Sequence, residues 1–374
     1  MPEPALRCVV IGGGVVGCSV AHRLAGLGAA VTLVDAGGRR PGASGRSFAW
    51  VNASSKRPFA YFRLNRLGME AHRRLAGPWW APSGHLEWAA DVVAEGELLA
   101  EAEEMAGWGY PVEVLTPGEA ARREPALRIP ARVEAVVAHP EEGYVSAPGY
   151  VEGVRELAGS LGTRFVDGVA VEQVLTRDGR ATGARLEDGT ALGADRVVVC
   201  AGRWSEELVA PLDVRVPLVP ADQAGSPALG LLVRTTPVGA SVARVVHAGP
   251  LAMRPDGGGS LLLHGADTDL ELGPDTPEEA GHPLAVQLLE RARSVLPALG
   301  EAGIESVRLG RRVLPEDGLS IVGWAPGYAG LYVVATHSGV TMAPALGELV
   351  ADEVAKGETA EELEPFRPGR FTGG

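Results

Sequence analysis

Two glycine-containing segments near opposite ends of the chain have the residue types of sites that bind a ligand through backbone N–H groups. The first, Gly12–Gly17, fits the pattern G-x-G-x-x-G and follows an apolar run. In this pattern the first glycine allows a tight turn, the second leaves room for a diphosphate, and the third lets helix and strand pack closely. Free N–H groups and the helix dipole attract the phosphate charge. The segment therefore predicts a dinucleotide site.

The second segment, Thr336–Thr341, follows an apolar run at residues 330–335 that is typical of a buried strand. Residues with helical spacing come next, which predicts a helix that begins near residues 341–344. The N–H groups of its first turn have no internal partner and carry partial positive charge, so they can stabilise an anion. His337 lies in this segment and titrates near neutral pH, so it could contact a cofactor or move a proton. The alternative is a turn histidine bonded to the backbone.

Arg311 and Arg312 form a third feature, because a guanidinium binds a carboxylate through two parallel hydrogen bonds. Such a residue would attract an anionic substrate into a protein whose formal net charge is −13. Alternation along a strand lets only one of the two point inward. The alternative interpretation is a pair of surface charges at a strand end.

The first forty residues supply the elements that would position the glycine turn. Residues 5–11 form a short β-branched apolar run, residues 18–27 have helical spacing, and residues 30–34 form a second apolar run. This is the order of a βαβ unit. Asp35 ends the second strand, where an acidic residue holds a ribose hydroxyl. Its charge disfavours a 2′-phosphate there, so FAD or NAD fits better than NADP.

Residues 163–200 help to decide between these two dinucleotides. The dipeptides Asp178-Gly179 and Asp188-Gly189 separate alternating segments and predict consecutive hairpins. A second buried strand follows at residues 195–200 and ends in a glycine turn. A nicotinamide dehydrogenase would usually continue with further βα repeats. The order favours the flavoprotein arrangement of the glutathione reductase type.

Composition excludes several other classes of protein. A net charge of −13 disfavours binding to nucleic acid, and no apolar run reaches the length of a membrane span. The amino terminus has no basic head before its apolar run, so we expect no signal peptide. The three cysteines have neither metal nor disulfide spacing, which predicts no metal site and a cytoplasmic protein. The oligomeric state is not predicted.

Five segments together resemble the D-amino acid oxidase, glycine oxidase and sarcosine oxidase family of FAD-dependent oxidoreductases. In chain order these are Val9–Gly17, Gly42–Ser47, Glu142–Ala147, Val197–Ser205 and the carboxyl-terminal third, with Gly310–Gly323, Gly330–Gly339 and Arg370-Phe371. The resemblance implies an α/β fold with a discontinuous FAD-binding Rossmann domain of the glutathione reductase type, at residues 1–80, 143–212 and 306–374. It also implies a second, antiparallel-sheet (α+β) substrate domain at residues 81–142 and 213–305.

The resemblance implies an enzyme that oxidises the C–N bond of an amino acid or secondary amine. A hydride would pass from the α-carbon to flavin N5, and the imine would then hydrolyse. Arg312 would pair with the substrate carboxylate, and His337 is a second candidate catalytic residue. The implied cofactor-binding residues are Gly12, Gly13, Gly14, Val15, Val16, Gly17, Asp35, Ala36, Ala43, Ser44, Gly45, Arg46, Ser47, Val171, Ala201, Gly202, Trp204, Gly310, Arg312, Ser338, Gly339, Val340 and Thr341.

Two departures from the family pattern bear on the cofactor and the electron acceptor. Sarcosine-type members attach the flavin through a cysteine, but no cysteine follows Cys200, so we predict non-covalent FAD. Monomeric sarcosine oxidases also place a lysine over the flavin to promote its reaction with O2. Lys56 and Lys356 are the only lysines and neither lies in the strand expected at residues 260–264. This favours an acceptor other than O2, although either remains open.

The sequence shows no obvious catalytic His/Asp pair, and a hydride route needs no acid–base side chain. Two alternatives also remain open. One is a nicotinamide-dependent dehydrogenase built on the same βαβ unit. The other is a non-catalytic flavin- or amino-acid-binding subunit of a larger dehydrogenase.

Overall fold

The computed structural model describes residues 5–39, 42–239 and 242–372. Residues 1–4, on which the expectation of no signal peptide partly rests, lie outside this description. Within the described ranges, no helix combines the length and the apolar character needed to cross a bilayer.

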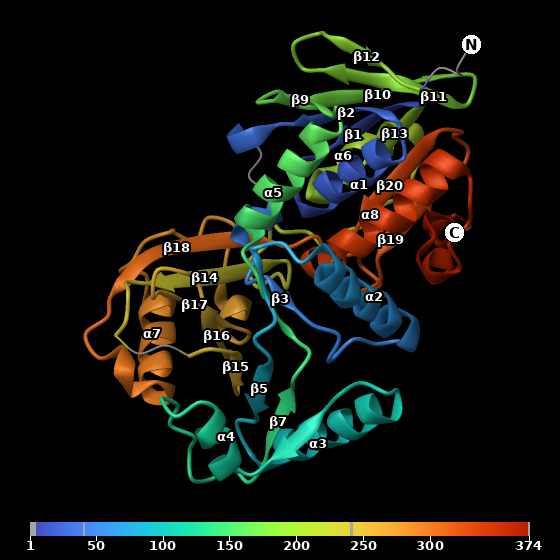
Figure 1. Ribbon diagram of the computed structural model, residues 1–374. Coiled ribbons are helices and arrows are strands. Elements are labelled where there is room, and N and C mark those ends of the chain that lie inside the picture. The colour runs from blue at the N-terminus through green and yellow to red at the C-terminus, as the bar shows by residue number, and fades with distance from the viewer. Residues whose placement is uncertain (1–4, 40–41, 240–241, 373–374) are drawn as a thin grey trace.

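A six-stranded, mainly parallel sheet forms the first layer of the upper half of the molecule (Figure 1). Its order is β19 (Ile321–Trp324), β20 (Leu331–Ala335), β13 (Arg196–Val199), β1 (Arg7–Ile11), β2 (Ala30–Asp35) and β9 (Arg164–Asp167), and only β19 runs antiparallel to its neighbour. The predicted βαβ unit is thus confirmed, with helix α1 (Val15–Gly26) between β1 and β2.

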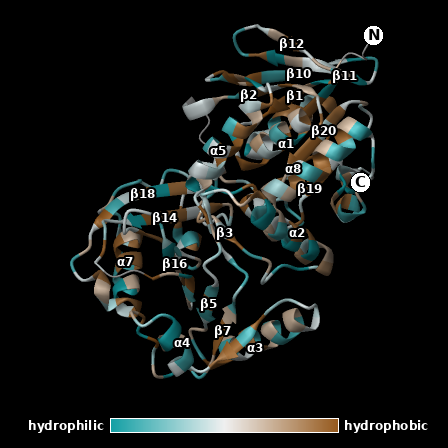
Figure 2. Cartoon of the chain, viewed as in Figure 1, coloured by the Kyte–Doolittle hydropathy of each residue, from teal (hydrophilic) through white to brown (hydrophobic). Residues whose placement is uncertain are grey.

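Side chains of this sheet alternate between two cores. Cys8 and Val10 of β1 pack with α1, α5 (Ala147–Ser160) and α8 (Gly339–Lys356). Val9 and Ile11 pack instead with the predicted meander, which forms a three-stranded antiparallel sheet of β10 (Val171–Arg177), β11 (Arg180–Leu186) and β12 (Ala191–Gly193). Because both faces are covered, the central strands β1 and β13 are apolar after their first residue, as their largely brown colour in Figure 2 shows.

An eight-stranded sheet forms the lower half of the molecule. Its order is β18 (Ile304–Arg311), β14 (Leu229–Thr235), β17 (Leu261–Gly265), β16 (Leu251–Pro255), β15 (Val245–Ala248), β5 (His85–Trp88), β7 (Val136–His139) and β6 (Glu113–Leu115). Only the pair β15–β5 is parallel. Helix α7 (Pro283–Val295) packs against it, with α3 (Val92–Gly107) and α4 (Pro117–Arg123) at the other end (Figure 1).

This second sheet confirms the expected mixed architecture. Strand β18 carries residues 306–311, which the sequence analysis assigned to the cofactor domain, into the eight-stranded sheet. The division of the chain into two domains remains a proposal.

A small sheet of β3 (Trp50–Val51), β8 (Gly143–Val145) and β4 (Trp80–Ala81) lies between the two large sheets. Helix α2 (Phe59–Leu75) follows β3 and packs against α8, where a Cβ at Gly68 would lie 2.3 Å from the carbonyl oxygen of Thr341. Leu64 and Ala71 of α2 are at most 2% exposed. Helix α2 therefore packs one apolar side against the core.

Helix α8 begins at Gly339, so the expected start near residues 341–344 is wrong. The expectation followed Pro344, since proline is common in the first turn of a helix. Here Pro344 lies inside the helix, and its missing N–H leaves the carbonyl oxygen of Val340 without its usual partner. His72 of α2 donates a hydrogen bond from Nε2 to that oxygen at 2.8 Å. The neighbouring helix thus satisfies the group that proline leaves free.

Candidate active site

A cavity of about 1100 Å³ opens at the carboxyl ends of the parallel strands and extends to the eight-stranded sheet. Ile11, Val34 and Val334 mark the first end, and Leu232, His247 and His264 mark the second. In open parallel sheets, ligands bind at this edge. The volume exceeds that of a usual pocket for a drug-sized ligand, as an extended dinucleotide requires.

The structure brings nearly all of the predicted site residues to this one cavity. Both candidate catalytic residues, Arg312 and His337, line it, and so do all of the predicted cofactor residues except Gly17 and Thr341. Gly17 lies behind the turn, where a Cβ would be 1.8 Å from the carbonyl oxygen of Gly12. Thr341 is buried and donates from Oγ1 to the carbonyl oxygen of Trp50 at 3.3 Å, which connects α8 to β3.

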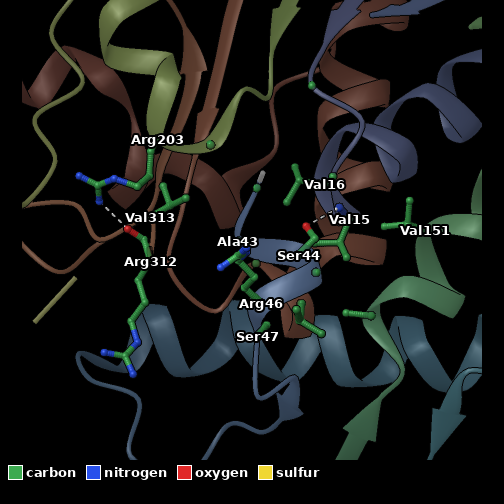
Figure 3. Close-up of a pocket in the computed structure, with 18 of the residues that line it drawn as sticks. Val15, Val16, Ala43, Ser44, Arg46, Ser47, Val151, Arg203, Arg312 and Val313 are labelled. Atoms are coloured by element: carbon green, nitrogen blue, oxygen red, sulfur yellow. Dashed lines mark hydrogen bonds between the residues drawn. The ribbon is translucent and has the colours of Figure 1, made fainter. Parts of the chain in front are cut away.

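The glycine turn has the geometry that the pattern predicts. Gly12 has a φ of +105°, and a Cβ there would lie 2.4 Å from the carbonyl oxygen of Cys200. A Cβ at Gly14 would lie 2.9 Å from Ser44 Oγ, which accepts a hydrogen bond from the N–H of Val15 at 3.1 Å (Figure 3). The glycine turn and Ser44 thus form a narrow cradle that a side chain at Gly14 would enter. Such a cradle fits a diphosphate.

Asp35 lies at the same edge and lines the cavity. Its carboxylate accepts hydrogen bonds from the N–H of Gly13 at 2.7 Å and of Gly37 at 2.8 Å. These bonds fix an anionic oxygen beside the glycine turn, where a ribose hydroxyl would donate to it. The donors and the acceptor of this end fit FAD.

The late segment approaches the middle of the cavity. Ser338 has a φ of 50° and precedes the first turn of α8, and its side chain makes no capping hydrogen bond. The imidazole of His337 lines the cavity, where burial, and then the charges of Lys56 and Arg312, lower its pKa to about 3. His337 is therefore neutral at physiological pH. Its role in catalysis remains a prediction.

Arg312 reaches the cavity, but its guanidinium is already bonded within the protein. Nη2 contacts Asp269 Oδ2 at 2.5 Å and lies 2.9 Å from His264 Nε2. Nη1 donates to the carbonyl oxygens of Pro227 and Leu229. A substrate carboxylate would therefore replace Asp269 at Nη2 or bind at Nε. Its pairing with substrate remains a prediction.

Lys56 is a cavity residue that the sequence analysis set aside. It lies in the loop between β3 and α2, outside the strand where a flavin-facing lysine was sought, yet it lines the cavity. The absence of a lysine from that strand therefore does not mean that no lysine lies near the cavity. Of the cations that line the cavity, Lys56 alone has neither a hydrogen bond nor an ion pair to any residue that the structure describes. Burial lowers its pKa, and Glu142 and Glu101 oppose this effect.

The sequence analysis also did not identify two histidines of the eight-stranded sheet as site residues. His247 of β15 and His264 of β17 line the cavity, and Nδ1 of His247 lies 2.8 Å from Nε2 of His85. His85 Nδ1 in turn lies 3.1 Å from Glu142 Oε2. The structure therefore contains a histidine–carboxylate pair, His85 and Glu142, although the sequence shows no obvious catalytic His/Asp pair. The partners are 57 and 162 residues apart, and no local spacing signals them.

A glycine turn at the carboxyl edge of a parallel sheet, a meander behind that sheet and a second sheet over the same cavity define a Rossmann-type FAD enzyme of two sheets. A family model described as FAD dependent oxidoreductase matches residues 7–353. The chain belongs to this FAD-dependent oxidoreductase family and is an enzyme of it.

Relatives and solved structures agree with this assignment. The chain is 29% identical to a glycine oxidase of Geobacillus kaustophilus, over 97% of each chain. It is 25% identical to a 4-methylaminobutanoate oxidase (formaldehyde-forming) of Paenarthrobacter nicotinovorans, over 98% of this chain and 46% of that one. The structure of an L-proline dehydrogenase from P. horikoshii superposes with a TM-score of 0.85 at 22% identity, covering 99% of this chain and 98% of that one. That similarity concerns the fold.

Proposed function

We propose that this enzyme oxidises the C–N bond of an amino acid or secondary amine, with non-covalently bound FAD as its cofactor. The observation that carries the proposal is the continuous cavity, because it joins the glycine turn to a wall with Arg312 and two histidines. The family assignment and the relatives named glycine oxidase and 4-methylaminobutanoate oxidase support the same reaction class. When bound, FAD supplies the acceptor for the hydride that leaves the substrate carbon.

The cofactor would be held by the chain at two places. The N–H groups of the glycine turn would bind the diphosphate and Asp35 the ribose, because both line the first end of the cavity. N–H groups at the start of α8, from Gly339 onward, would face the ring that gains negative charge on reduction.

Arg312 would orient the substrate by its carboxylate. Asp269 now occupies Nη2, and a substrate carboxylate that took its place would leave the charge around the guanidinium unchanged. His264 contacts both partners of this pair, at 2.9 Å from Arg312 and 2.8 Å from Asp269. When the substrate carboxylate displaces Asp269 from Arg312, His264 would donate a hydrogen bond to the released Asp269 carboxylate. The exchange is therefore compatible with the charges already present.

The state of the cysteines supports the non-covalent part of the proposal. All three are buried and free, and burial raises the thiol pKa of Cys8 and Cys18 to about 12 and that of Cys200 further. A protonated thiol is a poor nucleophile, so none would attack the flavin ring. Acid precipitation should leave all yellow colour in the supernatant. Colour retained in the pellet would contradict this part of the proposal.

The decisive experiment is an anaerobic screen of the purified enzyme with glycine, sarcosine, D-amino acids and proline-like amines. We expect at least one of these compounds to remove the flavin absorbance at about 450 nm. Repeating the assay in air with each compound that reduces the flavin would show whether O2 is the acceptor. A colourless protein would indicate the nicotinamide alternative. A yellow protein that no amine bleaches without partner proteins would indicate a flavin-binding subunit.

Arg312→Ala should retain FAD but weaken carboxylate substrates sharply. Losing one charged hydrogen-bond partner corresponds to about 1.5–3 kcal/mol, or roughly 10- to 100-fold in affinity. Arg311→Ala is the matched control, since Arg311 is exposed at the same rim and bonds to the carbonyl oxygen of Pro274. Equal kinetics for Arg312→Ala and the parent enzyme would refute the assignment.

A further inference from the structure

Glu142 is a buried carboxylate surrounded by donors. Its side chain is inaccessible to solvent, and it accepts hydrogen bonds from Tyr110 Oη at 2.6 Å, Trp50 Nε1 at 3.0 Å and the N–H of Ser54 at 3.1 Å. Hydrogen bonds donated to a carboxylate stabilise its ionised form, and Glu142 receives three of them. Burial alone would raise the pKa of Glu142, but His139, His85 and Tyr110 hold it below its ordinary value.

This fixed negative charge determines which nitrogen of His85 carries the proton. Nδ1 lies 3.1 Å from Glu142 Oε2, although the oxygen lies off the ideal N–H direction. Because the carboxylate only accepts, neutral His85 is protonated at Nδ1 and has its lone pair at Nε2. That lone pair faces His247 Nδ1 at 2.8 Å. His247 must therefore donate from Nδ1, and its own lone pair is at Nε2.

His247 presents this basic nitrogen to the cavity. The ring lines the cavity, and Nδ1 is already occupied by His85, so Nε2 is the nitrogen available to a ligand. The indole of Trp50 packs against the imidazole rings of His247 and His85, with ring centroids 4.4 Å and 4.7 Å away. The two histidines also lie on paired strands, β15 and β5. The arrangement is rigid and aimed at the space where the proposed substrate binds.

We propose that His247, oriented by His85 and Glu142, accepts the proton that the substrate ammonium group loses before its C–N bond is oxidised. An N–H bond breaks at the substrate and an N–H bond forms at His247 Nε2, so the lone pair stays on the amine. The proton at His247 Nδ1 then shifts to His85 Nε2, which places the positive charge beside Glu142. No oxidant is needed for this step. The role rests on the proposed function.

Other charged groups surround the relay of His247, His85 and Glu142. His139 stacks on His85, with ring centroids 5.4 Å apart, and Glu87 lies 3.9 Å from His85 Nε2. His264 with its Asp269–Arg312 pair and Lys56 face the same cavity. Burial, and then His85 and His264, lower the pKa of His247. His247 is therefore neutral before the proton transfer.

His85, Glu87 and His139 also offer ligand atoms within 4.8 Å of one another, which a metal ion could use. In the structure, however, both nitrogens of His85 face other groups, Glu142 and His247. The two arrangements exclude each other, because a metal-bound His85 could not accept the proton from His247 Nδ1. Metal analysis of the purified protein therefore belongs to the test.

The kinetic test compares the parent enzyme with His247→Gln across pH, using the amine that reduces the flavin in the anaerobic screen. We expect a loss of about 10²-fold in the reduction rate constant near neutral pH, a usual contribution of a proton acceptor. The loss should shrink above the pKa of the amine itself, because the substrate then arrives neutral. A merely structural role predicts a loss that does not change with pH.

Two variants sharpen this comparison. In His85→Gln the amide oxygen can still accept from His247 Nδ1 but cannot take up a proton, so the acidic limb of the profile should move to lower pH. His22→Gln alters a histidine of helix α1 that does not line the cavity, and the pH dependence of its rate should keep the parent shape. The pH-dependent loss in His22→Gln, or its absence in His247→Gln, would overturn the proposal.

A second readout needs no turnover. Ring ¹⁵N NMR of the enzyme without substrate should show His247 protonated at Nδ1 and free at Nε2 at neutral pH. The opposite tautomer, or a stoichiometric metal ion in the purified protein, would overturn the proposal. If no amine reduces the parent enzyme, the proposed function fails. If the parent is reduced and His247→Gln shows a pH-independent loss, only the role of His247 fails.

Discussion

Alanine at Gly14 and at Gly17 should separate cofactor binding from stability, because an added methyl group meets different atoms at the two positions. At Gly17 the Cβ would lie 1.8 Å from the carbonyl oxygen of Gly12 and 3.3 Å from Cys200 Cβ. The first is a backbone atom of a tight turn and cannot rotate away. At Gly14 the nearest atom is Ser44 Oγ at 2.9 Å, and the next is 4.0 Å away. A hydroxyl can change rotamer.

These distances lead us to expect different losses in the free energy of unfolding for the two variants. Overpacking a close contact costs about 1–3 kcal/mol and occasionally more, and Gly17→Ala belongs at or above the upper end because helix α1 must move from β1. Gly14 is the N-cap of α1, where alanine is less favourable than glycine by roughly 1 kcal/mol or less. Gly14→Ala should therefore fold nearly as stably as the parent, while its methyl group fills the cradle.

The assay measures two quantities on each variant: the free energy of urea unfolding of the FAD-free protein, and the flavin retained after gel filtration. We expect Gly17→Ala to lose both folding stability and bound flavin. We expect Gly14→Ala to lose only the bound flavin. The double variant Gly14→Ala/Ser44→Ala removes the hydroxyl contact, and we still expect no flavin. Parent-like retention of flavin in Gly14→Ala would refute the diphosphate site. Rescue in the double variant would show that displacement of Ser44 had expelled it.

Two further predictions concern groups that the sequence did not single out. Burial lowers the pKa of His72 to about 4 from 6.5, so the unfolded chain takes up this proton first as pH falls, and stability is lost between these values. At pH 4 this amounts to about 3 kcal/mol, and His72→Gln should unfold in urea without that part of the pH dependence. Lys56→Met should weaken carboxylate ligands roughly 10- to 100-fold, measured by titrating flavin absorbance. Unchanged affinity would mean that Lys56 does not contact the carboxylate.

Contiguous patterns carried most of what could be predicted from the sequence. The glycine turn needs only its own spacing and the flanking strand and helix, so Gly12 and Asp35 could be assigned from the order of residues alone. Properties that depend on distant partners could not be predicted. Pro344 lies inside the helix that begins at Gly339, and it is His72, a distant residue, that satisfies the carbonyl group left free by this proline. The engagement of Arg312 depends on Asp269, a residue with no local signal.

Glu142 shows how one buried group can serve both fold and chemistry. The segment Glu142–Ala147 contributed to the family resemblance, but the pattern gave the carboxylate no task. In the structure its oxygens accept hydrogen bonds from Trp50 of β3, from Ser54 of the loop that follows β3, and from Tyr110 of the segment after α3. It also faces His85 of the eight-stranded sheet.

The same contacts that join these segments stabilise the ionised form of the carboxyl group, since each of the three hydrogen bonds is donated to it. The ionised group in turn fixes the tautomer of His85 and, through it, that of the cavity histidine. Desolvation of this charge is costly unless every lone pair is engaged. A fold that retains such a group therefore orients two histidines at the substrate end of the cavity as a direct consequence of satisfying it.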